Sequence, residues 1–328
     1  MLIDSYDVAL LDLDGVVYRG HHPIENAADS LAKARAQGMR LAYVTNNASR
    51  TPSAVAALLT GLGIPTDGAD VVTSSQAAAR VLSERLSPGA KVLVVGGTAL
   101  RHAVYARGLR PVSTALEGPE AVVQGFTPDL SYGLIAQGVQ AVLNGALFVA
   151  SNADLTISAP YGPNKPGNGS LIRVIQTATG VAPVVAGKPE ISLHRESILR
   201  TGAERPLVVG DRLDTDIEGA FNGGADSLLV FTGVTDPLTA LTAEPRHRAT
   251  YMAPDLTGLL ADFPDVEENA GRYTCAGWTA AWDGEAITLS GAGDKWHGLR
   301  ALAAAAFRTP EPASPEAVSS ALEVLGLR

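Results

Sequence analysis

Short apolar runs alternate with stretches of helical spacing along most of the chain. The first run, residues 6–13 (YDVALLDL), ends in acidic residues, and its length and flanks favour a buried parallel strand over a helix. Helical spacing follows over residues 25–38 and stops at Gly38, a residue type common just past a helix end. The order strand, helix, strand predicts parallel pairing with right-handed crossovers.

The same alternation continues to residue 231. Further strands are predicted at residues 41–44, 71–72, 91–95, 121–124, 146–149, 184–185, 206–209 and 227–231. Helices are predicted between them at residues 49–62, 75–86, 98–107, 131–143, 190–200 and 214–222. The expected fold class is therefore α/β, with a doubly wound parallel sheet of the Rossmann-like type.

The last sixty residues follow a different pattern, beyond an acidic joint at 264–270 (PDVEENA). Small and large side chains alternate over residues 273–281, a turn at 282–284 follows, and residues 286–289 form a return strand. Two helices are expected, one over 294–307 and one starting at Ser314-Pro315. Such a small C-terminal ββαα unit (268–328) is marginal by itself, so it should dock on the rest of the chain or on another subunit.

Composition narrows the class of protein. The chain has 328 residues, 46% of them apolar, a net charge of −9 and one cysteine. Disorder, a disulfide framework and a zinc finger are excluded, and the acidic balance argues against nucleic acid as a partner. The sequence shows neither a basic leader with an apolar core nor an apolar run of about 18 residues. We therefore expect a cytoplasmic protein with no membrane partner.

Four polar motifs carry the candidate chemistry. They are DLDGV at 12–16, TNN at 45–47, GKP at 187–189 and GDRLDTD at 210–216. Each motif alone has an ordinary explanation as a helix cap or a solvated turn. Together they supply carboxylates, a lysine and a Thr/Asn pair near strand ends, where open α/β sheets place their ligands. This set suits Mg²⁺ and a phosphoryl group, because hard oxygen donors hold the metal and Lys neutralises phosphate charge.

In this order the four motifs resemble those of the haloacid dehalogenase superfamily. The closest resemblance is to its phosphatases of the p-nitrophenyl, phosphoglycolate and glycerol-phosphate type. Two further sequence segments are similar to those of that group, LFVASNAD at 147–154 and KPGNGSL at 165–171. The resemblance covers residues 4–260 and does not reach the C-terminal unit.

The resemblance implies catalytic roles for the first motif. Asp12 would be the nucleophile that forms an aspartyl-phosphate. Asp14 would protonate the leaving oxygen and then activate water, while its backbone carbonyl would contact Mg²⁺. A dehalogenase needs no acid for its leaving group, so Asp14 favours hydrolysis of a phosphate ester.

The other motifs would bind phosphate and metal. Thr45 and Asn46 would hold phosphate oxygens, and Lys188 would neutralise the charge between the nucleophile and the phosphate. Asp211 would join Asp12 and the Asp14 carbonyl as a metal ligand, with Asp216 supporting Asp211 from behind. The expected cofactor is Mg²⁺.

Motif spacing predicts an inserted domain. The 143 positions between the second and third motifs exceed what one or two crossovers fill. We therefore expect a phosphatase core at 1–86 and 183–262, a cap domain at 87–182, and a small flap near 16–23. A large cap at this place implies selection of a small substrate. Candidate substrate-selecting residues in the cap are Asn152, Asp154 and Asn164.

The expected function is Mg²⁺-dependent hydrolysis of a small phosphorylated metabolite. Glycerol 3-phosphate and 2-phosphoglycolate are the leading candidate substrates, because the resembling enzymes favour small phosphorylated polyols and acids. Pyridoxal phosphate and nucleotide monophosphates remain alternatives, as do transfer of the phosphoryl group to a second sugar and an inactive metabolite-binding regulator. The family also leaves open a homodimer formed through the cap.

Overall fold

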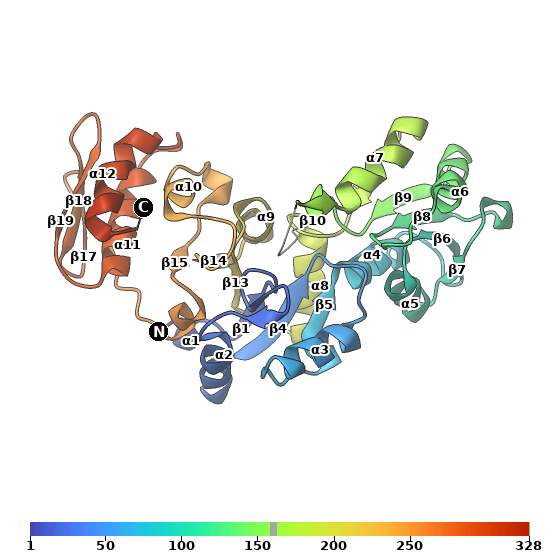
Figure 1. Ribbon diagram of the computed structural model, residues 1–328, viewed down its shortest axis with the longest axis horizontal. Coiled ribbons are helices and arrows are strands. Elements are labelled where there is room, and N and C mark those ends of the chain that lie inside the picture. Colours follow the sequence, from blue (N-terminus) through green and yellow to red (C-terminus); the bar gives the residue numbers. More distant parts are fainter. Residues whose placement is uncertain (158–162, 328) are drawn as a thin grey trace. The chain divides into compact units, whose positions relative to one another are not determined.

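The computed structural model describes residues 1–157 and 163–327 and divides into two compact units (Figure 1). Unit 1 contains Met1–Leu41 and Ala203–Arg328, and unit 2 contains Ala42–Gly202. Parallel strands and helices alternate in both, which confirms the predicted fold class. No helix among the described residues combines the length and the apolar character needed to cross a bilayer.

Unit 1 is built on four parallel strands in the order β15-β14-β13-β1. Their bounds are β1 Val8–Leu11, β13 Pro206–Gly210, β14 Asp226–Val230 and β15 Tyr251–Ala253. Every residue of β1 is buried, as a strand covered on both faces requires. The predicted flap forms a two-stranded hairpin of β2 (Tyr18–Arg19) and β3 (His22–Pro23).

Short helices cover these strands. They are α1 Leu2–Ser5, α2 Ala27–Ala36, α9 Glu218–Gly223 and α10 Pro237–Leu241. Unit 1 also has 3₁₀ turns at Pro245–His247 and Leu256–Leu260, and unit 2 has them at Gly68–Asp70 and Ala115–Glu117. The predicted helix at 214–222 is in fact a π-helical turn, Leu213–Ile217, that continues into α9. Single π turns are frequent at functional sites.

Unit 2 contains a parallel strand pair and a five-stranded parallel sheet. In the pair, β4 (Arg40–Thr45) lies beside β5 (Val71–Thr73). The five-stranded sheet has the order β12-β9-β8-β6-β7. Its strands are β6 Lys91–Val95, β7 Arg110–Val112, β8 Ala121–Gln124, β9 Leu147–Ala150 and β12 Val184–Val185. A separate hairpin joins β10 (Thr156–Ile157) to β11 (Lys165–Pro166).

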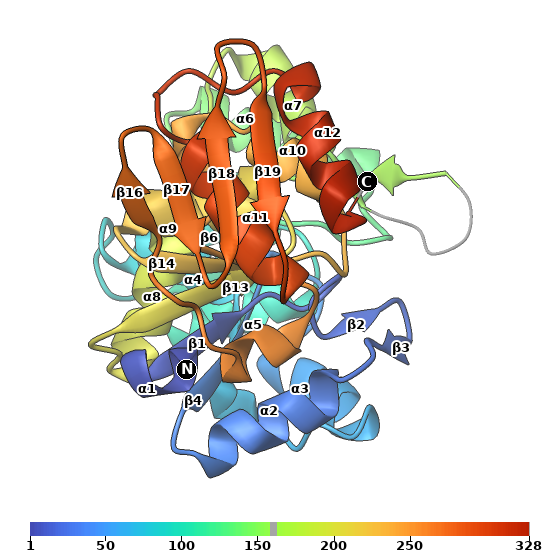
Figure 2. The same ribbon diagram turned by 90° about the vertical axis from the view of Figure 1, so that its left-hand side faces the viewer.

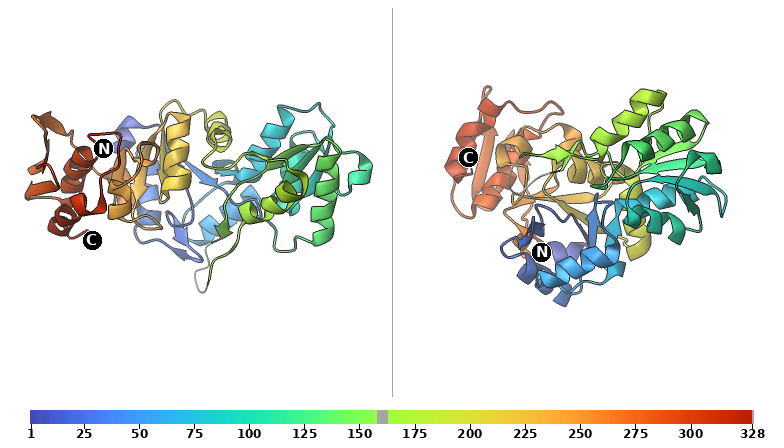
Figure 3. Two further views of the ribbon diagram at one scale, coloured as in Figure 1. Left: turned by 90° about the horizontal axis from the view of Figure 1, so that it is seen from above. Right: turned by 45° about the vertical axis from the view of Figure 1, so that its right-hand side comes forward.

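Helices pack on both faces of the five-stranded sheet. The helices of unit 2 are α3 Pro52–Gly61, α4 Ser74–Ser83, α5 Thr98–Ala106, α6 Tyr132–Leu143, α7 Asn168–Thr179 and α8 Ile191–Thr201. Helix α6 contacts β6 and β8 and packs against α7, whereas α5 contacts β6 and β7 and packs against α4 (Figure 3). This arrangement is the doubly wound pattern that the sequence predicted.

The structure adds elements that the sequence did not predict, namely the strands β7, β10, β11 and β15 and the helices α1, α7 and α10. The strand at 184–185, which the sequence assigned to the core, pairs with β9 in the five-stranded sheet. A two-residue strand carries too little pattern to reveal its partner, because register is decided by pairing across the fold. The remaining domain boundaries stay predictions.

The C-terminal unit contains four antiparallel strands rather than two (Figure 2). They are β16 Glu267–Asn269, β17 Arg272–Cys275, β18 Trp278–Trp282 and β19 Ile287–Gly291, and α11 (Lys295–Ala306) and α12 (Pro315–Leu325) pack on them. The predicted strand at 273–281 is interrupted by a turn at Ala276 and Gly277, both at positive φ. The predicted hairpin and the two helices are therefore confirmed in order. The strand β16 was not predicted, and the single strand predicted at 273–281 corresponds to two strands, β17 and β18.

The C-terminal unit docks on the sheet of unit 1, one of the places that the sequence allowed. One continuous apolar cluster joins Leu299 and Leu302 of α11 to Leu229 of β14, Met252 of β15 and Leu241 of α10. Fully buried side chains of this kind contribute most of the free energy of folding. The C-terminal unit is therefore part of the core of unit 1.

Leu299→Ala should test this shared core. Leu299 is fully buried in the cluster, so the loss of its side chain should lower the free energy of unfolding by about 2–5 kcal/mol. Val324→Ala on α12, where the side chain is 57% exposed, is the control and should change it by less than about 0.5 kcal/mol. Urea denaturation measures both. Equal effects would contradict a core shared between the C-terminal unit and the sheet.

Candidate active site

The chain bends sharply where β1 ends, and two carboxylates lie at this bend. The backbone N–H of Asp12 still donates to Val209 O at 2.8 Å, so the strand pairing reaches the first carboxylate. Gly15 follows with φ of +89°, a conformation that side chains disfavour. A Cβ there would also lie 2.5 Å from Asp211 Oδ2. Glycine is thus required at position 15 both for the bend and for the close approach to Asp211.

Asp14 lies at the outer side of this bend. The residue as a whole is exposed, but desolvation of its carboxyl raises the pKa of Asp14 above its usual value. The backbone N–H of Gly20 and the charge of Arg19 act in the opposite direction and are weaker. A raised pKa favours the protonated form, which is the form that a general acid needs.

Two further carboxylates come from the end of β13 and the π turn. Asp211 and Asp216 are each only 1% exposed. Asp211 Oδ2 accepts the backbone N–H of Val234 at 2.8 Å, and Asp216 Oδ2 accepts that of Arg212 at 3.2 Å. A Cβ at Gly233 would overlap the Asp211 carboxylate, so the chain after β14 also needs a glycine. Sequence reasoning missed Gly233, although a Thr-Gly pair directly after a strand is a usable signal.

These carboxylates form a candidate cation site. One oxygen from each of Asp12, Asp211 and Asp216 lies within 4.8 Å of the other two. Buried carboxylates repel one another unless a cation neutralises them, and hard oxygen donors suit Mg²⁺. The donor set therefore fits the expected metal. Asp214, in the same loop, is instead held by two hydrogen bonds from the Arg212 guanidinium and is 60% exposed.

The polar motifs of unit 2 are joined by a hydrogen-bond network. Asn46 Oδ1 accepts the backbone N–H of Lys188 at 2.8 Å, and Asn46 Nδ2 donates to Lys188 O at 3.1 Å and to Asp154 Oδ1 at 3.0 Å. Both amide donors of Asn46 are engaged, so its side chain positions Lys188. Its predicted contact with phosphate stays a prediction.

Lys188 and Thr45 are both withdrawn from solvent, at 3% and 7% exposure. Lys188 Nζ donates to Val44 O at 3.1 Å, and Thr45 Oγ1 accepts the backbone N–H of Asn47. A Cβ at Gly187 would lie 2.6 Å from Asn46 Oδ1, which explains the glycine of the third motif. The buried ammonium is thus fixed by the strand that ends in Thr45.

The three cap candidates occupy different environments. Asn152 is buried, and its Nδ2 donates to Asn46 O at 2.7 Å while its Oδ1 accepts the backbone N–H of Asp154. Asp154 is half-buried in the same network, whereas Asn164 is exposed beside β11. The structure thus brings two of the three together with Asn46. Selection of substrate by any of them stays a prediction.

Comparisons with known proteins agree with this chemistry. Residues 9–110 match the family model of haloacid dehalogenase-like hydrolases, and residues 185–259 match a second model described as HAD-hydrolase-like. A D-glycerol 3-phosphate phosphatase of Mycobacterium tuberculosis is 44% identical over 89% of this chain and 81% of its own length. The chain belongs to the haloacid dehalogenase-like hydrolases. It is an enzyme, and the expected phosphoric monoester hydrolase class is confirmed.

Two further relatives extend the comparison. The crystal structure of a glycerol phosphate phosphatase from Mycobacterium tuberculosis in complex with magnesium has a TM-score of 0.88 and 41% identity, covering 100% of this chain and 99% of that one. A 5'-nucleotidase of Bacillus subtilis is 37% identical over 74% of this chain and 94% of its own length. The magnesium complex and the carboxylates here together confirm the expected cofactor of this haloacid dehalogenase-like hydrolase.

The C-terminal unit also has a counterpart. Residues 275–327 match a model described as a GCN5-related N-acetyltransferase like domain. The side chain of Asp294 accepts the backbone N–H of Trp296 and caps α11. A carboxylate at a helix N-terminus occupies the position where an anion would otherwise bind. The N-terminus of α11 is thus already capped, and the apolar contacts of the C-terminal unit are with β14, β15 and α10 of unit 1.

The metal assignment leads to a prediction with a control in the same loop. Mg²⁺ should raise the melting temperature of the wild-type protein, because a ligand that binds only the folded state stabilises it. Asp211→Asn should remove most of this increase, whereas Asp214→Asn should retain it. Differential scanning fluorimetry against Mg²⁺ concentration measures both. Equal shifts in the two variants would contradict a metal site at Asp211.

Proposed function

We propose that this enzyme hydrolyses a small phosphate monoester, with glycerol 3-phosphate as the lead substrate and 2-phosphoglycolate next. The observation that carries the proposal is the trio of carboxylates, Asp12, Asp211 and Asp216, gathered where β1 and β13 end. Support for the substrate comes from the relative at 44% identity that is a D-glycerol 3-phosphate phosphatase.

The proposed chemistry has two steps. Asp12 attacks phosphorus to give an aspartyl-phosphate, while Asp14 gives its proton to the leaving alkoxide. Asp14 then accepts a proton from the water that hydrolyses this intermediate, which regenerates Asp12. Bound Mg²⁺ would supply charge neutralisation for the phosphoryl oxygens. Lys188 and Thr45 are proposed to bind the same oxygens, because a desolvated ammonium and a fixed hydroxyl are preorganised for developing negative charge.

A 5'-nucleotidase activity is the second candidate. It is supported by the Bacillus subtilis relative at 37% identity. We also propose that residues 87–182 select the substrate, since this segment supplies four of the strands of the five-stranded sheet and the helices α5, α6 and α7. Both candidates require release of inorganic phosphate from a monoester, and they differ only in the alcohol that leaves.

A substrate panel tests the proposal. The Mg²⁺-loaded enzyme is assayed for phosphate release from glycerol 3-phosphate, 2-phosphoglycolate, 5'-AMP, pyridoxal phosphate and a phosphoserine peptide. The highest kcat/KM is expected for glycerol 3-phosphate and the lowest for the peptide. A kcat/KM about tenfold higher for 5'-AMP would replace the lead substrate by a nucleotide. Absence of phosphate release from all five would overturn the proposed hydrolase function.

A further inference from the structure

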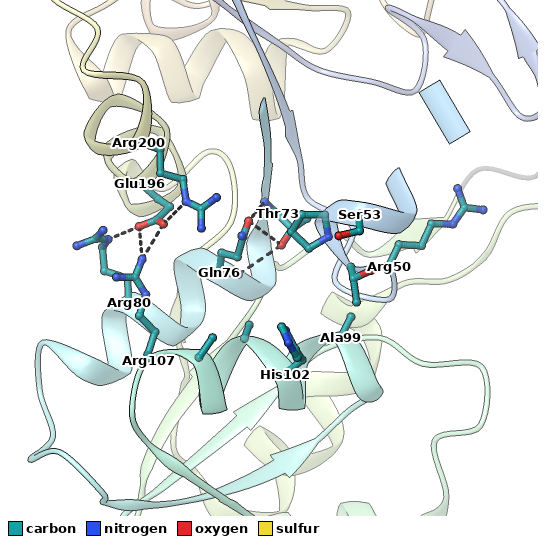
Figure 4. A pocket seen from close by; sticks show the side chains of 14 residues that line it. Arg50, Ser53, Thr73, Gln76, Arg80, Ala99, His102, Arg107, Glu196 and Arg200 are labelled. Atoms are coloured by element: carbon teal, nitrogen blue, oxygen red, sulfur yellow. Dashed lines mark hydrogen bonds and ion pairs between the residues drawn. The ribbon is translucent and has the colours of Figure 1, made fainter. Parts of the chain in front are cut away.

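Unit 2 contains a cavity of about 580 Å³, lined by both charged and apolar residues, that the proposed chemistry does not use (Figure 4). Its walls come from the start of α3, one side of α4, one face of α5, and α8. None of Thr45, Asn46, Asn152, Asp154 or Lys188 lines it. Its volume lies within the range of sites that hold small organic ligands.

The cavity is strongly basic in an otherwise acidic chain. Four arginines line it together with only one carboxylate, Glu196, whereas the whole chain carries a net charge of −9. Glu196 is fully buried and is bound by three of those arginines: Arg107 Nη2 lies 2.7 and 2.9 Å from its two oxygens, Arg200 Nε lies 2.8 Å away, and Arg80 Nε also donates. Arg80 Nη1 also lies 3.9 Å from Glu84 Oε1, so two carboxylates face these three guanidinium groups and cannot neutralise them fully. These side chains therefore retain net positive charge and unused N–H donors.

Glu196 makes the basic cluster rigid. It lies 116 positions from Arg80 and 89 from Arg107 along the chain, and it holds their guanidinium groups at one end of the cavity (Figure 4). Arg50 lies at the opposite end, near Ser53 and Thr73. Positive charge fixed before binding costs little to order, which is the condition for a tight anion site.

Two helix N-termini add to the positive potential. Helices α3 and α4 are ten residues each, and their capping residues Thr51 and Thr73 both line the cavity. The partial positive charge of a helix N-terminus favours an anion at its first turn. Each cap satisfies some backbone N–H groups of its helix, with Ala54 N donating to Thr51 and Gln76 N to Thr73. The macrodipoles add to the field of the arginines.

The remaining wall is apolar. Ala99, Ala103 and Ala106 are spaced so that they share one face of α5, with His102 beside them. Small methyl groups leave room for a flat organic portion of a ligand next to the arginines. Positive charge at one end with an apolar wall beside it fits an anion larger than inorganic phosphate.

We propose that this cavity is a binding site for an organic diphosphate, a ligand with two adjacent phosphate groups on an apolar or ring-shaped body. The phosphates bind Arg80, Arg107 and Arg200, and the organic portion lies along α5 toward Arg50. Neither the carboxylates of the metal site nor Lys188 is among the residues that line the cavity. Helix α8 begins three residues after Lys188, so a ligand on Arg200 rests on the element that follows the third motif.

Binding is tested by calorimetry on the Mg²⁺-loaded full chain at constant free Mg²⁺. The probes are methylenediphosphonate and adenosine 5'-(α,β-methylene)diphosphate, whose P–C–P linkages resist hydrolysis. Each should bind at one equivalent per chain, and the adenosine probe should bind more tightly because it also covers the α5 wall. Equal affinities would contradict the organic part of the assignment, and absence of binding by both would overturn the proposal.

Matched variants locate the bound probe. Ala106→Glu places a negative charge at an exposed position of the wall, and Ala106→Gln is its uncharged control of the same size. The first should weaken binding about tenfold or more, and the second should leave it nearly unchanged. Arg50→Gln should also weaken the adenosine probe, whereas Arg110→Gln on β7 should not. Equal affinity in Ala106→Glu and Ala106→Gln would overturn the proposal. So would displacement of the probe by glycerol 3-phosphate in the Asp12→Asn enzyme, because it would place the probe among the catalytic groups.

Discussion

Asp12→Asn is expected to reduce turnover by about four orders of magnitude or more, with the fold unchanged. The amide has nearly the same shape as the carboxylate but lacks the nucleophilic oxygen, and removal of a nucleophile from a concerted set of groups typically eliminates most of the rate enhancement. Steady-state phosphate release from glycerol 3-phosphate measures the loss. Circular dichroism and the melting temperature check the fold.

A trapping experiment gives this prediction a second readout. Acid quenching of the wild-type enzyme during turnover of a ³²P-labelled substrate should leave label on a peptide that contains Asp12, and the Asp12→Asn enzyme should retain none. Asp4→Asn, at an exposed position of the N-terminal helix, is the control and should behave as wild type. Normal turnover or a labelled enzyme in Asp12→Asn would rule out the proposed nucleophile.

Asp14→Asn should separate the two chemical steps according to the leaving group. With glycerol 3-phosphate, the alkoxide needs a proton in order to leave, so the first step should slow by about 10²–10⁴-fold. With p-nitrophenyl phosphate the phenolate is stable without a proton. The variant should then release about one equivalent of nitrophenolate rapidly and turn over slowly, because no base activates water for the second step.

Stopped-flow absorbance of nitrophenolate and quenched-flow assays of the phosphorylated enzyme measure the two steps. The backbone carbonyl of residue 14 is retained in Asp14→Asn, so the Mg²⁺-dependent increase in melting temperature should persist. Equal slowing of the first step with both esters would contradict the assignment of Asp14 as the acid.

Much of the candidate site could be predicted from local sequence. Apolar runs that end in polar residues locate strand ends, since a buried parallel strand must be apolar and its carboxyl end opens toward ligands. The two aspartates before Gly15 and the GDRLDTD loop were identified in this way, and the structure gathers Asp12, Asp211 and Asp216. Gly15, which directly follows Asp14, has the positive φ that a sharp bend requires.

The roles of side-chain amides could not be predicted in this way. The expected contacts of Asn46 and Asn152 with phosphate and substrate stay predictions, and the sequence did not show that their amides also bind the backbones of Lys188, Asp154 and Asn46 itself. An amide has donors and an acceptor that serve a ligand or a neighbouring loop equally well. Which one it binds depends on residues more than a hundred positions away.

Helix α7 was missed for a related reason. It begins at Asn168 and Gly169, and both residue types disfavour helices. A Cβ at Gly169 would overlap Ala153 O, so the glycine is required by close packing against another segment. Local propensity predicts a loop at such a residue, whereas the close tertiary contact explains why a glycine is present in the helix.

The sequence by itself determined the α/β class, the family, the phosphatase chemistry and the carboxylates at two strand ends, because each depends on residues close together in the chain. Only the tertiary structure decided that residues 184–185 join the five-stranded sheet, that the C-terminal unit has four strands docked on β14 and β15, and that a basic cavity surrounds Glu196. Hydrophobic periodicity records whether a position is buried but not which distant residue covers it, and that pairing is settled only when the whole chain packs.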